Sequence, residues 1–240
     1  MYRLAKIPGK RAFSIHTSKT TIWYDPPIPQ RRFYMLGKSH HSLGLHLADK
    51  YLSGIPNQYR SAFLLGCVQP DRNPLTYLKG SLQYQTLRGH NYENARRFIH
   101  RLSRRLEHRR KWNIWDYYSL GKLIHYIADS HTYVHNAFSA SGLSFHRCYE
   151  SQLQPYFLEY LLNTPDVHIL WEDRLDTALN QYHVQYCREK PAIHTDVKYI
   201  VNACNCVFTL LFIHRTTKPG VLPCTKSLQA AAKRPSPQFS

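Results

Sequence analysis

The sequence contains no run of about 20 apolar residues, the length that a membrane-spanning helix requires. Its longest apolar stretch, Tyr199 to Ile213, is interrupted by Asn202 and Asn205. We therefore expect a buried core helix there and no transmembrane segment. The start of the chain also lacks the apolar region of a secretory signal. Both absences favour a cytoplasmic protein, with peripheral contact with a membrane left open.

The Cys-x-x-Cys motif is absent as well. Six cysteines occur, and none forms a Cys-x-x-Cys motif. Without a secretory signal, free thiols in a reducing compartment are the default. Cys204 and Cys206 are either metal ligands or small apolar residues of a helix, and we favour the second interpretation.

Acidic residues are scarce. The chain of 240 residues has 15 Asp and Glu against 32 Lys and Arg, which gives a formal net charge of +17. This excess suits an anionic partner: a phosphate ester, a nucleic acid or an acidic membrane surface. Charge alone does not choose among them. The length is sufficient for one domain with a sizeable core plus tails.

The two ends of the chain differ in composition from its middle. Residues 1–34 carry prolines and scattered basic charge without helical periodicity, which predicts a disordered basic N-terminal extension. We interpret it as an extension before a functional start at Met35, with an organellar transit peptide as the alternative. The Pro and Ser residues near the end of the chain predict a flexible C-terminal tail over residues 219–240. The helical domain should therefore span residues 35–218.

Between the tails, apolar residues recur every three or four positions, and few alternating strand patterns compete. The predicted fold class is all-α, as one compact multi-helix domain. We expect Gly66 and the Pro70-Asp71 turn to end the second helix, and Pro155 to kink or split the fifth. The expected helices are one that begins at His40 and others over 57–65, 98–106, 114–130, 145–162, 169–187 and 196–214.

Five residues follow the pattern His-x3-Asp-x5-His-x10-His-x3-Glu: His125, Asp129, His135, His146 and Glu150. The first two lie four positions apart, so they share one face of a helix, and the last two do the same. Imidazole and carboxylate groups are ligands that Zn²⁺ takes, and a carboxylate between imidazoles can bridge two ions. The pattern therefore predicts a metal site.

Three further residues belong with these five because of their positions. Asp71 follows a predicted helix, His90 precedes one, and His40 (or its neighbour His41) opens the first helix. Positions at loops and helix starts suit ligands, because rigid helices hold them in place. The candidate metal ligands are thus His40, Asp71, His90, His125, Asp129, His135, His146 and Glu150.

At this point the chain resembles a known family, the zinc-dependent phospholipase C proteins, which are related to zinc-dependent single-strand nucleases. It is most similar to the short intracellular bacterial branch, from about Met35 to about Tyr160. The sequence GKLIHYIAD, residues 121–129, resembles the family's helix with a metal-binding His and Asp. The later and earlier ligands of the family are matched by His135-Asn136, by His146 and Glu150, by the Pro70-Asp71 turn and by His90.

The resemblance implies two or three zinc ions, with Asp129 as a bridge. It favours His40 over His41, because Leu43 then lies three residues on, at the apolar position typical of the family. Asp71 would lie beside the cluster as a ligand or as a base for the attacking water. The implied sets are His90, His125 and Asp129 for one ion; His135, His146 and Glu150 for a second; and His40 with Asp129 for a third.

The third set is where this chain departs from the resemblance. In the secreted members, a free N-terminal Trp closes that site with its amine and carbonyl. Here Trp23 is the sole Trp before the core, and no signal sequence exists to expose it as an N-terminus.

The predicted function is zinc-dependent hydrolysis of a phosphodiester by a metal-activated water, as in phospholipase C. The substrate would be a phospholipid or another phosphodiester. One alternative is a zinc-dependent single-strand nuclease, which would place aromatic platforms beside the metals. Another is a non-catalytic zinc-binding protein with closed coordination.

Other conspicuous residues have ordinary interpretations. The basic run from Arg96 to Arg105 is a solvated helix face or a specific anion site, and we favour the first. Histidine is abundant, so His131 and His168 either support the ligands or are incidental. The residues expected to be surface or core without a role in the site are His46, His100, His108, His183 and His214; Trp112, Trp115 and Tyr118 are expected in the core.

Overall fold

The computed structural model describes residues 13–17, 20–24, 36–73, 90, 92–136, 143–163, 169 and 172–213. The chain divides into two units, Met1–Tyr34 and Met35–Ser240. The predicted tail 219–240 and the candidates His168 and His214 lie outside the described residues.

The first unit contains a β-hairpin. Strand β1 (Phe13–Thr17) pairs antiparallel with β2 (Thr20–Tyr24), and Phe13 lies opposite Tyr24. Sequence reasoning expected no regular element in this stretch. The Thr, Ile, Trp and Tyr residues of β2 are typical of strands, and this local signal was missed.

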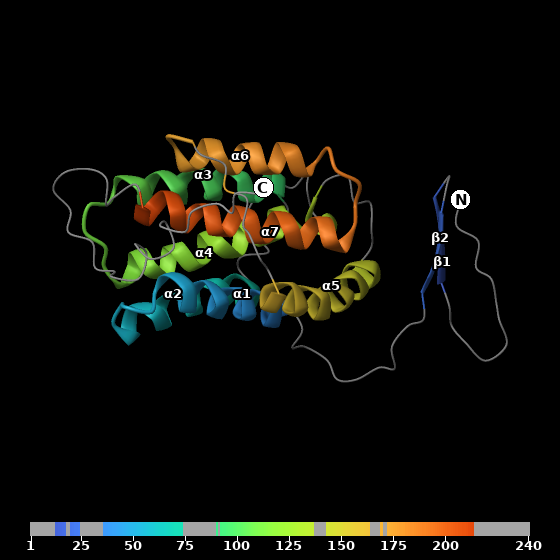
Figure 1. Ribbon diagram of the computed structural model, residues 1–240, viewed down its shortest axis with the longest axis horizontal. Helices are drawn as coiled ribbons and strands as arrows, with labels where there is room; N and C mark the ends of the chain where they lie inside the picture. The colour runs from blue at the N-terminus through green and yellow to red at the C-terminus, as the bar shows by residue number, and fades with distance from the viewer. Residues whose placement is uncertain are drawn as a thin grey trace, which may run out of the picture. The chain divides into compact units, whose positions relative to one another are not determined.

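The second unit is built of helices in three layers (Figure 1). Helices α3 (Tyr92–His108) and α6 (Leu175–Tyr186) form one outer layer. The middle layer contains α4 (Ile114–Ser130) and α7 (Ile193–Phe208). The other outer layer contains α1 (Leu36–Tyr51), α2 (Asn57–Arg72) and α5 (Leu143–Asn163). All described regular elements of this unit are helical, so the all-α prediction is confirmed.

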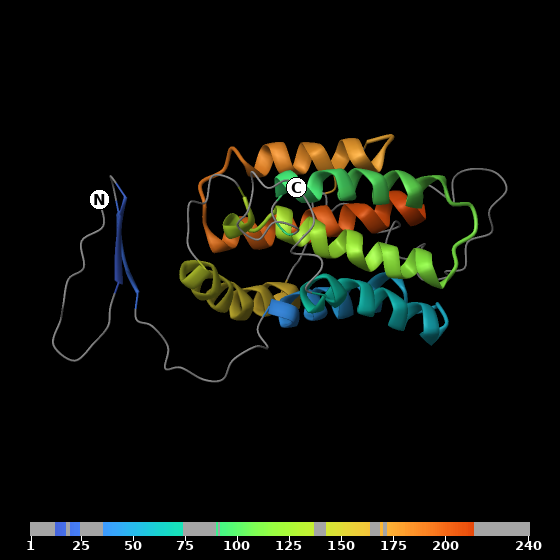
Figure 2. The same cartoon turned by 180° about the vertical axis from the view of Figure 1, so that it is seen from behind.

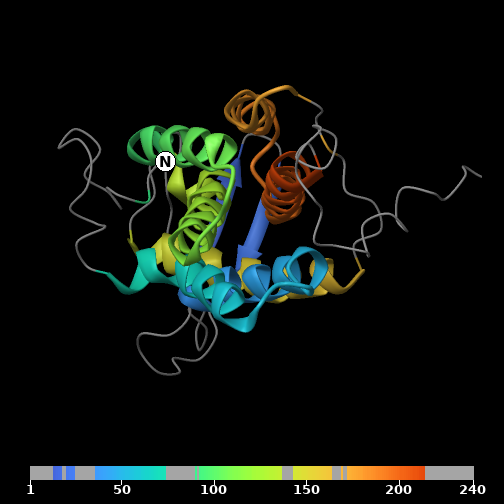
Figure 3. The same cartoon turned by 90° about the vertical axis from the view of Figure 1, so that its left-hand side faces the viewer.

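Helix α4 is central to this arrangement. Figures 2 and 3 show it between α2 on one side and α3 on the other. Its residues Leu120, Leu123 and Ile124 are buried in the core. At its start, the Asn113 side chain accepts hydrogen bonds from the amides of Trp115 and Asp116, and the Asp116 carboxylate accepts one from the Asn113 amide. This capping box fixes the helix start that the sequence predicted.

Helix α2 continues to Arg72, so the prediction that it ends at Gly66 was wrong. Gly66 instead faces Gly121 where α2 crosses α4. A Cβ added to Gly66 would lie 2.2 Å from the carbonyl oxygen of Tyr118, and one added to Gly121 would lie 2.1 Å from that of Phe63. The glycines therefore allow a close approach of two backbones.

Proline also has a different role from the predicted one. Pro70 lies in the last turn of α2, where its missing N–H removes one helical hydrogen bond close to the natural end. As a result, Asp71 belongs to a helix and not to a turn. Helix α5 likewise continues through Pro155 without being split.

The apolar stretch near the end of the domain forms α7 and a π-helical turn, η3 (Thr209–Ile213). Cys204 and Cys206 are fully buried there, and burial raises the pKa of the Cys206 thiol to about 12. No described group of potential metal ligands includes either cysteine. None of the described helices has the length and apolarity to cross a membrane.

Helix α6 begins at Leu175, six residues later than predicted.

Candidate metal centre

The C-terminal half of α4 presents His125 and Asp129 on one face. Their Nε2 and Oδ2 atoms lie 3.2 Å apart, and both side chains are buried. The Nδ1 atom of His125 lies 2.9 Å from the carbonyl oxygen of Cys67 on α2. A carbonyl only accepts, so Nδ1 carries the hydrogen. The other ring nitrogen, Nε2, therefore faces Asp129 and is the one that can bind a metal ion.

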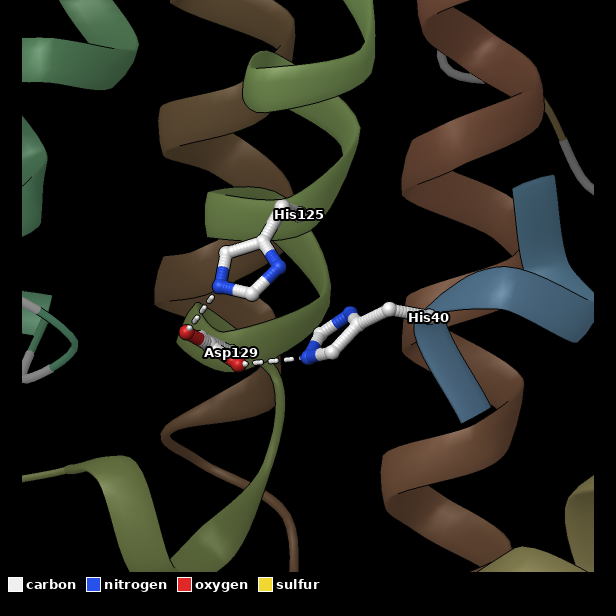
Figure 4. Close-up of side chains that lie close together, drawn as sticks. All are labelled: His40, His125 and Asp129. Atoms are coloured by element: carbon white, nitrogen blue, oxygen red, sulfur yellow. Dashed lines mark ion pairs between the residues drawn. The ribbon is translucent and has the colours of Figure 1, made fainter. Parts of the chain in front are cut away.

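His40 reaches the same carboxylate from α1. Its Nε2 lies 3.2 Å from Oδ1 of Asp129, while His125 approaches Oδ2 (Figure 4). The His40 and His125 rings are 4.0 Å apart between centroids. His41 is exposed. The structure thus brings His40, and not His41, into the cluster.

His90 and Asp71 complete the first part of the cluster. The Nδ1 atom of His90 lies 2.8 Å from Oδ2 of Asp129 and 3.2 Å from Nε2 of His125. Asp71 Oδ1 lies 3.6 Å from each of these two histidine nitrogens. The other oxygen of Asp71 lies 3.9 Å from His40. Side chains from α1, from α2 and from the residue His90 before α3 therefore meet those of α4 at its C-terminal end.

A second part of the cluster combines a short 3-10 turn with α5. His135 lies in this turn, η2 (Tyr133–His135), and His146 and Glu150 lie one helical turn apart on α5. Oε1 of Glu150 is 3.2 Å from His135 Nε2 and 3.0 Å from His146 Nε2. His135 Nε2 is also 3.7 Å from Asp129 Oδ1. Asp129 therefore connects the two parts.

These residues fit divalent metal ions. Three groups have ligand atoms within 4.8 Å of one another: His40, His125 and Asp129; Asp71, His90 and His125; and His135, His146 and Glu150. Three buried atoms have no hydrogen-bond partner: Oδ2 of Asp71, Nδ1 of His135 and Nδ1 of His146. Such atoms are costly unless something binds them, and zinc takes nitrogen and oxygen ligands of these types.

The carboxylates of Asp129 and Glu150 are ionised. Burial would raise the pKa of Asp129, but the charges of His135 and His125 and hydrogen bonds from neighbouring histidines hold it well below its usual value. For Glu150, burial is outweighed by hydrogen bonds from His135 and His146, which lower its pKa to about 2. The site is therefore an anionic centre that attracts positive charge.

The histidines respond to the same charges. Burial alone would lower the pKa of His90, but the hydrogen bond and charge of Asp129 raise it. His125 follows the same rule, since the charges of Asp129 and Asp71 outweigh its burial and raise its pKa. The carboxylates favour a cation at these nitrogens, either a proton or a metal ion.

A family model described as zinc dependent phospholipase C matches residues 39–193. The chain belongs to the zinc-dependent phospholipase C family. The matched region includes all eight candidate ligands. Neither the curated proteins nor the solved structures yield a match to this chain. Membership supports zinc-dependent hydrolysis of phosphoesters at the level of the family, and the intracellular bacterial branch stays a prediction.

Asp196 is a buried acid that supports the second part of the cluster, and the family resemblance did not indicate it. Oδ2 of Asp196, on α7, accepts hydrogen bonds from the Tyr133 amide at 2.8 Å and the Tyr149 hydroxyl at 2.7 Å. Oδ1 accepts one from the Tyr186 hydroxyl at 2.8 Å. Burial raises the pKa of Asp196 to about 6, although these hydrogen bonds oppose the rise. Its distance in sequence leaves no local signal that could have revealed it.

The other aromatic and histidine predictions have mixed outcomes. Trp115 is 66% exposed, so its predicted place in the core was wrong; it lies in the first turn of α4, at the surface. His183 is buried, donates from Nε2 to the Asn136 side-chain oxygen and stacks on Tyr92, as expected for a core histidine. His100 and His108 are exposed.

Proposed function

We propose that this chain is a zinc-dependent phosphodiester hydrolase of the phospholipase C type. The observation that carries the proposal is the position of Asp129. Its two oxygens approach His40 on one side and His90 and His125 on the other, within 3.2 Å. Such a buried carboxylate can bridge ions, and its link to His135 joins the second group of ligands.

The proposed ligand sets follow the three groups of the cluster. They differ from the sets implied by resemblance at two points: Asp71 takes the place of Asp129 beside His90 and His125, and His125 joins His40 and Asp129. The groups support two or three ions per chain, and the approach of the two Asp129 oxygens to His40 and to His90 supports Asp129 as the bridge. The proposed ligands are His40, Asp71, His90, His125, Asp129, His135, His146 and Glu150.

Zinc, when bound, would neutralise phosphate oxygens and lower the pKa of a water molecule. Asp71 has the geometry to assist. One of its oxygens faces His90 and His125, and the buried Oδ2 atom has no hydrogen-bond partner. We assign Asp71 as a ligand through Oδ1 and as the base that accepts a proton from the attacking water through Oδ2. The carboxylates of Asp129 and Glu150 remain ionised and hold the histidines in position.

Elemental analysis combined with three assays tests this function. The purified full chain should contain at least two zinc ions and should hydrolyse phosphatidylcholine vesicles faster than single-stranded DNA. A soluble phosphodiester serves as the third substrate. Less than one divalent ion per chain, in protein never exposed to chelator, would contradict the proposal. Faster cleavage of DNA would favour the nuclease.

One observation favours a second candidate, a non-catalytic zinc-binding protein. The cavity beside Asp129, His135 and Glu150 has a volume of about 40 Å³, which is room for a water molecule and not for a phosphodiester. This candidate predicts bound zinc without hydrolysis of any of the three substrates. The nuclease has less support, since Phe157 is the one aromatic side chain among the described residues that line this cavity, and it is buried.

A further inference from the structure

A second and larger cavity is lined by residues of α3 and α6. These two helices form the outer layer opposite α1 and α2 (Figure 1). We call this cavity the basic cleft. Its volume is about 940 Å³, and its walls are α3 and α6. Ile127, Ser130 and His131, at the end of α4, also line it. None of the eight proposed metal ligands lines this cavity, so it is separate from the metal centre.

The walls of the basic cleft carry an excess of positive charge. Among the described residues, the single carboxylate that lines it is Asp176, which is already paired with Arg174 at 2.7 Å and with His100 at 3.1 Å. Of the lining arginines, Arg105 lies 3.3 Å from the buried Asp116. The others make no ion pair with a carboxylate of the described residues. The lining arginines are Arg96, Arg97, Arg101, Arg104 and Arg105.

These arginines belong to the run that sequence reasoning favoured as a solvated helix face. The structure places all five arginines at the surface, as that interpretation requires, and it also shows that the run borders a concave surface. Guanidinium groups that converge on a cavity match the geometry of phosphate, which they bind through two parallel hydrogen bonds. The positive charge is therefore available to a ligand.

His131 provides an independent observation. Its side chain is buried, and its Nδ1 lies 2.8 Å from the carbonyl oxygen of Ile127. Because a carbonyl accepts, Nδ1 carries the hydrogen, and Nε2 is left as an acceptor. This buried Nε2 atom has no hydrogen-bond partner. His131 lines the basic cleft, so a small shift of its ring would let a donor such as a hydroxyl group of a ligand there reach Nε2.

The lining also discriminates among anionic ligands. Tyr92 and His183 stack on each other, with ring centroids 3.4 Å apart, and both are buried. They offer no free face to a nucleic acid base. A concave surface does not suit a flat membrane. Its volume lies near the upper end of pockets for small molecules, which span about 300–1,000 Å³.

We infer that the basic cleft binds a small polyanion that carries both phosphate and hydroxyl groups, of the class of phosphorylated polyols. Arginines of α3 bind the phosphates, and Nε2 of His131 accepts a hydrogen bond from a hydroxyl. This inference is independent of the proposed hydrolysis, since it uses none of the metal ligands.

Calorimetric titration of the full chain, in about 0.15 M salt, tests the inference. One probe is inositol 1,4,5-trisphosphate, which has phosphates and free hydroxyls. The other is inorganic tripolyphosphate, which lacks the polyol. The charge variant is the double substitution Arg101→Gln and Arg104→Gln. Its control, Arg110→Gln with Arg188→Gln, removes the same charge from exposed residues that do not line the cleft.

The charge variant should bind both probes at least about tenfold more weakly, whereas the control should change affinity less than about twofold. His131→Leu should weaken the inositol trisphosphate alone, and His131→Gln, which keeps an acceptor, should restore part of the loss. Zinc content and melting temperature show whether each variant is folded.

Three results would overturn the inference. The first is no binding of inositol trisphosphate at millimolar concentration. The second is equal behaviour of the charge variant and its control. The third is binding of single-stranded DNA or anionic vesicles through the same arginines in the absence of inositol trisphosphate binding. If a folded His131→Leu protein kept full affinity, the hydroxyl contact would be wrong.

Discussion

Asp196 accepts a hydrogen bond from the backbone amide of Tyr133 at 2.8 Å, two residues before His135. The same oxygen accepts the hydroxyl of Tyr149, the neighbour of Glu150. One buried carboxylate on α7 therefore ties together the turn and the helix that carry the second group of proposed ligands. The positions of those ligands therefore depend on α7, although α7 supplies none of the proposed ligands.

The first prediction concerns Asp196 and pH. Its folded pKa is about 6, above the ordinary value of 3.8, so ionisation is less favourable in the folded state. Its contribution to the free energy of unfolding should therefore decrease as pH rises from about 4 to 6, by on the order of 3 kcal/mol. Asp196→Asn removes this titration. Relative to the parent, the variant should gain stability between pH 4.5 and pH 7, measured by urea unfolding of both proteins.

Any bound zinc that is lost in acid is lost from both proteins. Its effect on stability therefore cancels when the variant is compared with the parent at the same pH. A parent that gains stability over the variant as pH rises would contradict the raised pKa of Asp196.

The second prediction concerns Asp129. Asp129→Asn keeps the size of the side chain but removes the charge that holds His40, His90 and His125 together. At least one zinc ion should be lost, and phosphodiester hydrolysis should fall by about 100-fold, while the helical content is kept. Elemental analysis and a rate measurement on the same sample check both effects.

Asp116→Asn is the matched control on the same helix. Asp116 is buried, caps α4 and lies 3.3 Å from both Arg105 and Arg109. The control should lower the melting temperature without lowering zinc per folded chain. Equal zinc loss in the two variants would remove the bridging role of Asp129.

The third prediction concerns the glycine crossing of α2 and α4. Gly66→Ala and Gly121→Ala each place a methyl group within 2.2 Å of a backbone oxygen, which cannot move without its helix. Each should destabilise the fold by at least about 1–3 kcal/mol, the range for overpacked cores. Gly44→Ala is the comparison, because its nearest neighbours are side-chain atoms at 3.1–3.3 Å. Denaturant unfolding should rank Gly44→Ala as the mildest, and the reverse order would refute the close crossing.

The fourth prediction concerns the first unit. Because Met1–Tyr34 forms a unit of its own, a chain that starts at Met35 should keep its zinc content and melting temperature. Metal analysis and calorimetry of both chains provide the measurement. Unfolding of the shorter chain would show that the helices depend on residues 1–34.

Local patterns account for the parts that sequence reasoning predicted well. Helix 114–130 has its own cap and apolar periodicity, and its bounds are those observed. The pairs at spacing four, His125 with Asp129 and His146 with Glu150, do lie on common helix faces. Information of this kind is contained within a few turns of one helix.

What sequence reasoning missed depends on contacts between distant segments. Gly66 is a helix terminator by local rules, and its real role requires Gly121 on another helix. Asp196 is 47 residues from Tyr149, and nothing in their spacing links them. The roles of the proposed ligands stay predictions until metal is measured.

The contact between Cys67 and His125 has a consequence for mutagenesis. The atom that holds the histidine ring belongs to the backbone, so every substitution at Cys67 retains it. An alanine scan of α2 would therefore not detect this contact. A comparison of side chains among homologues would not reveal the contact either. The orientation of one proposed ligand is thus encoded in the path of a helix axis, and only a change that displaces that axis can alter it.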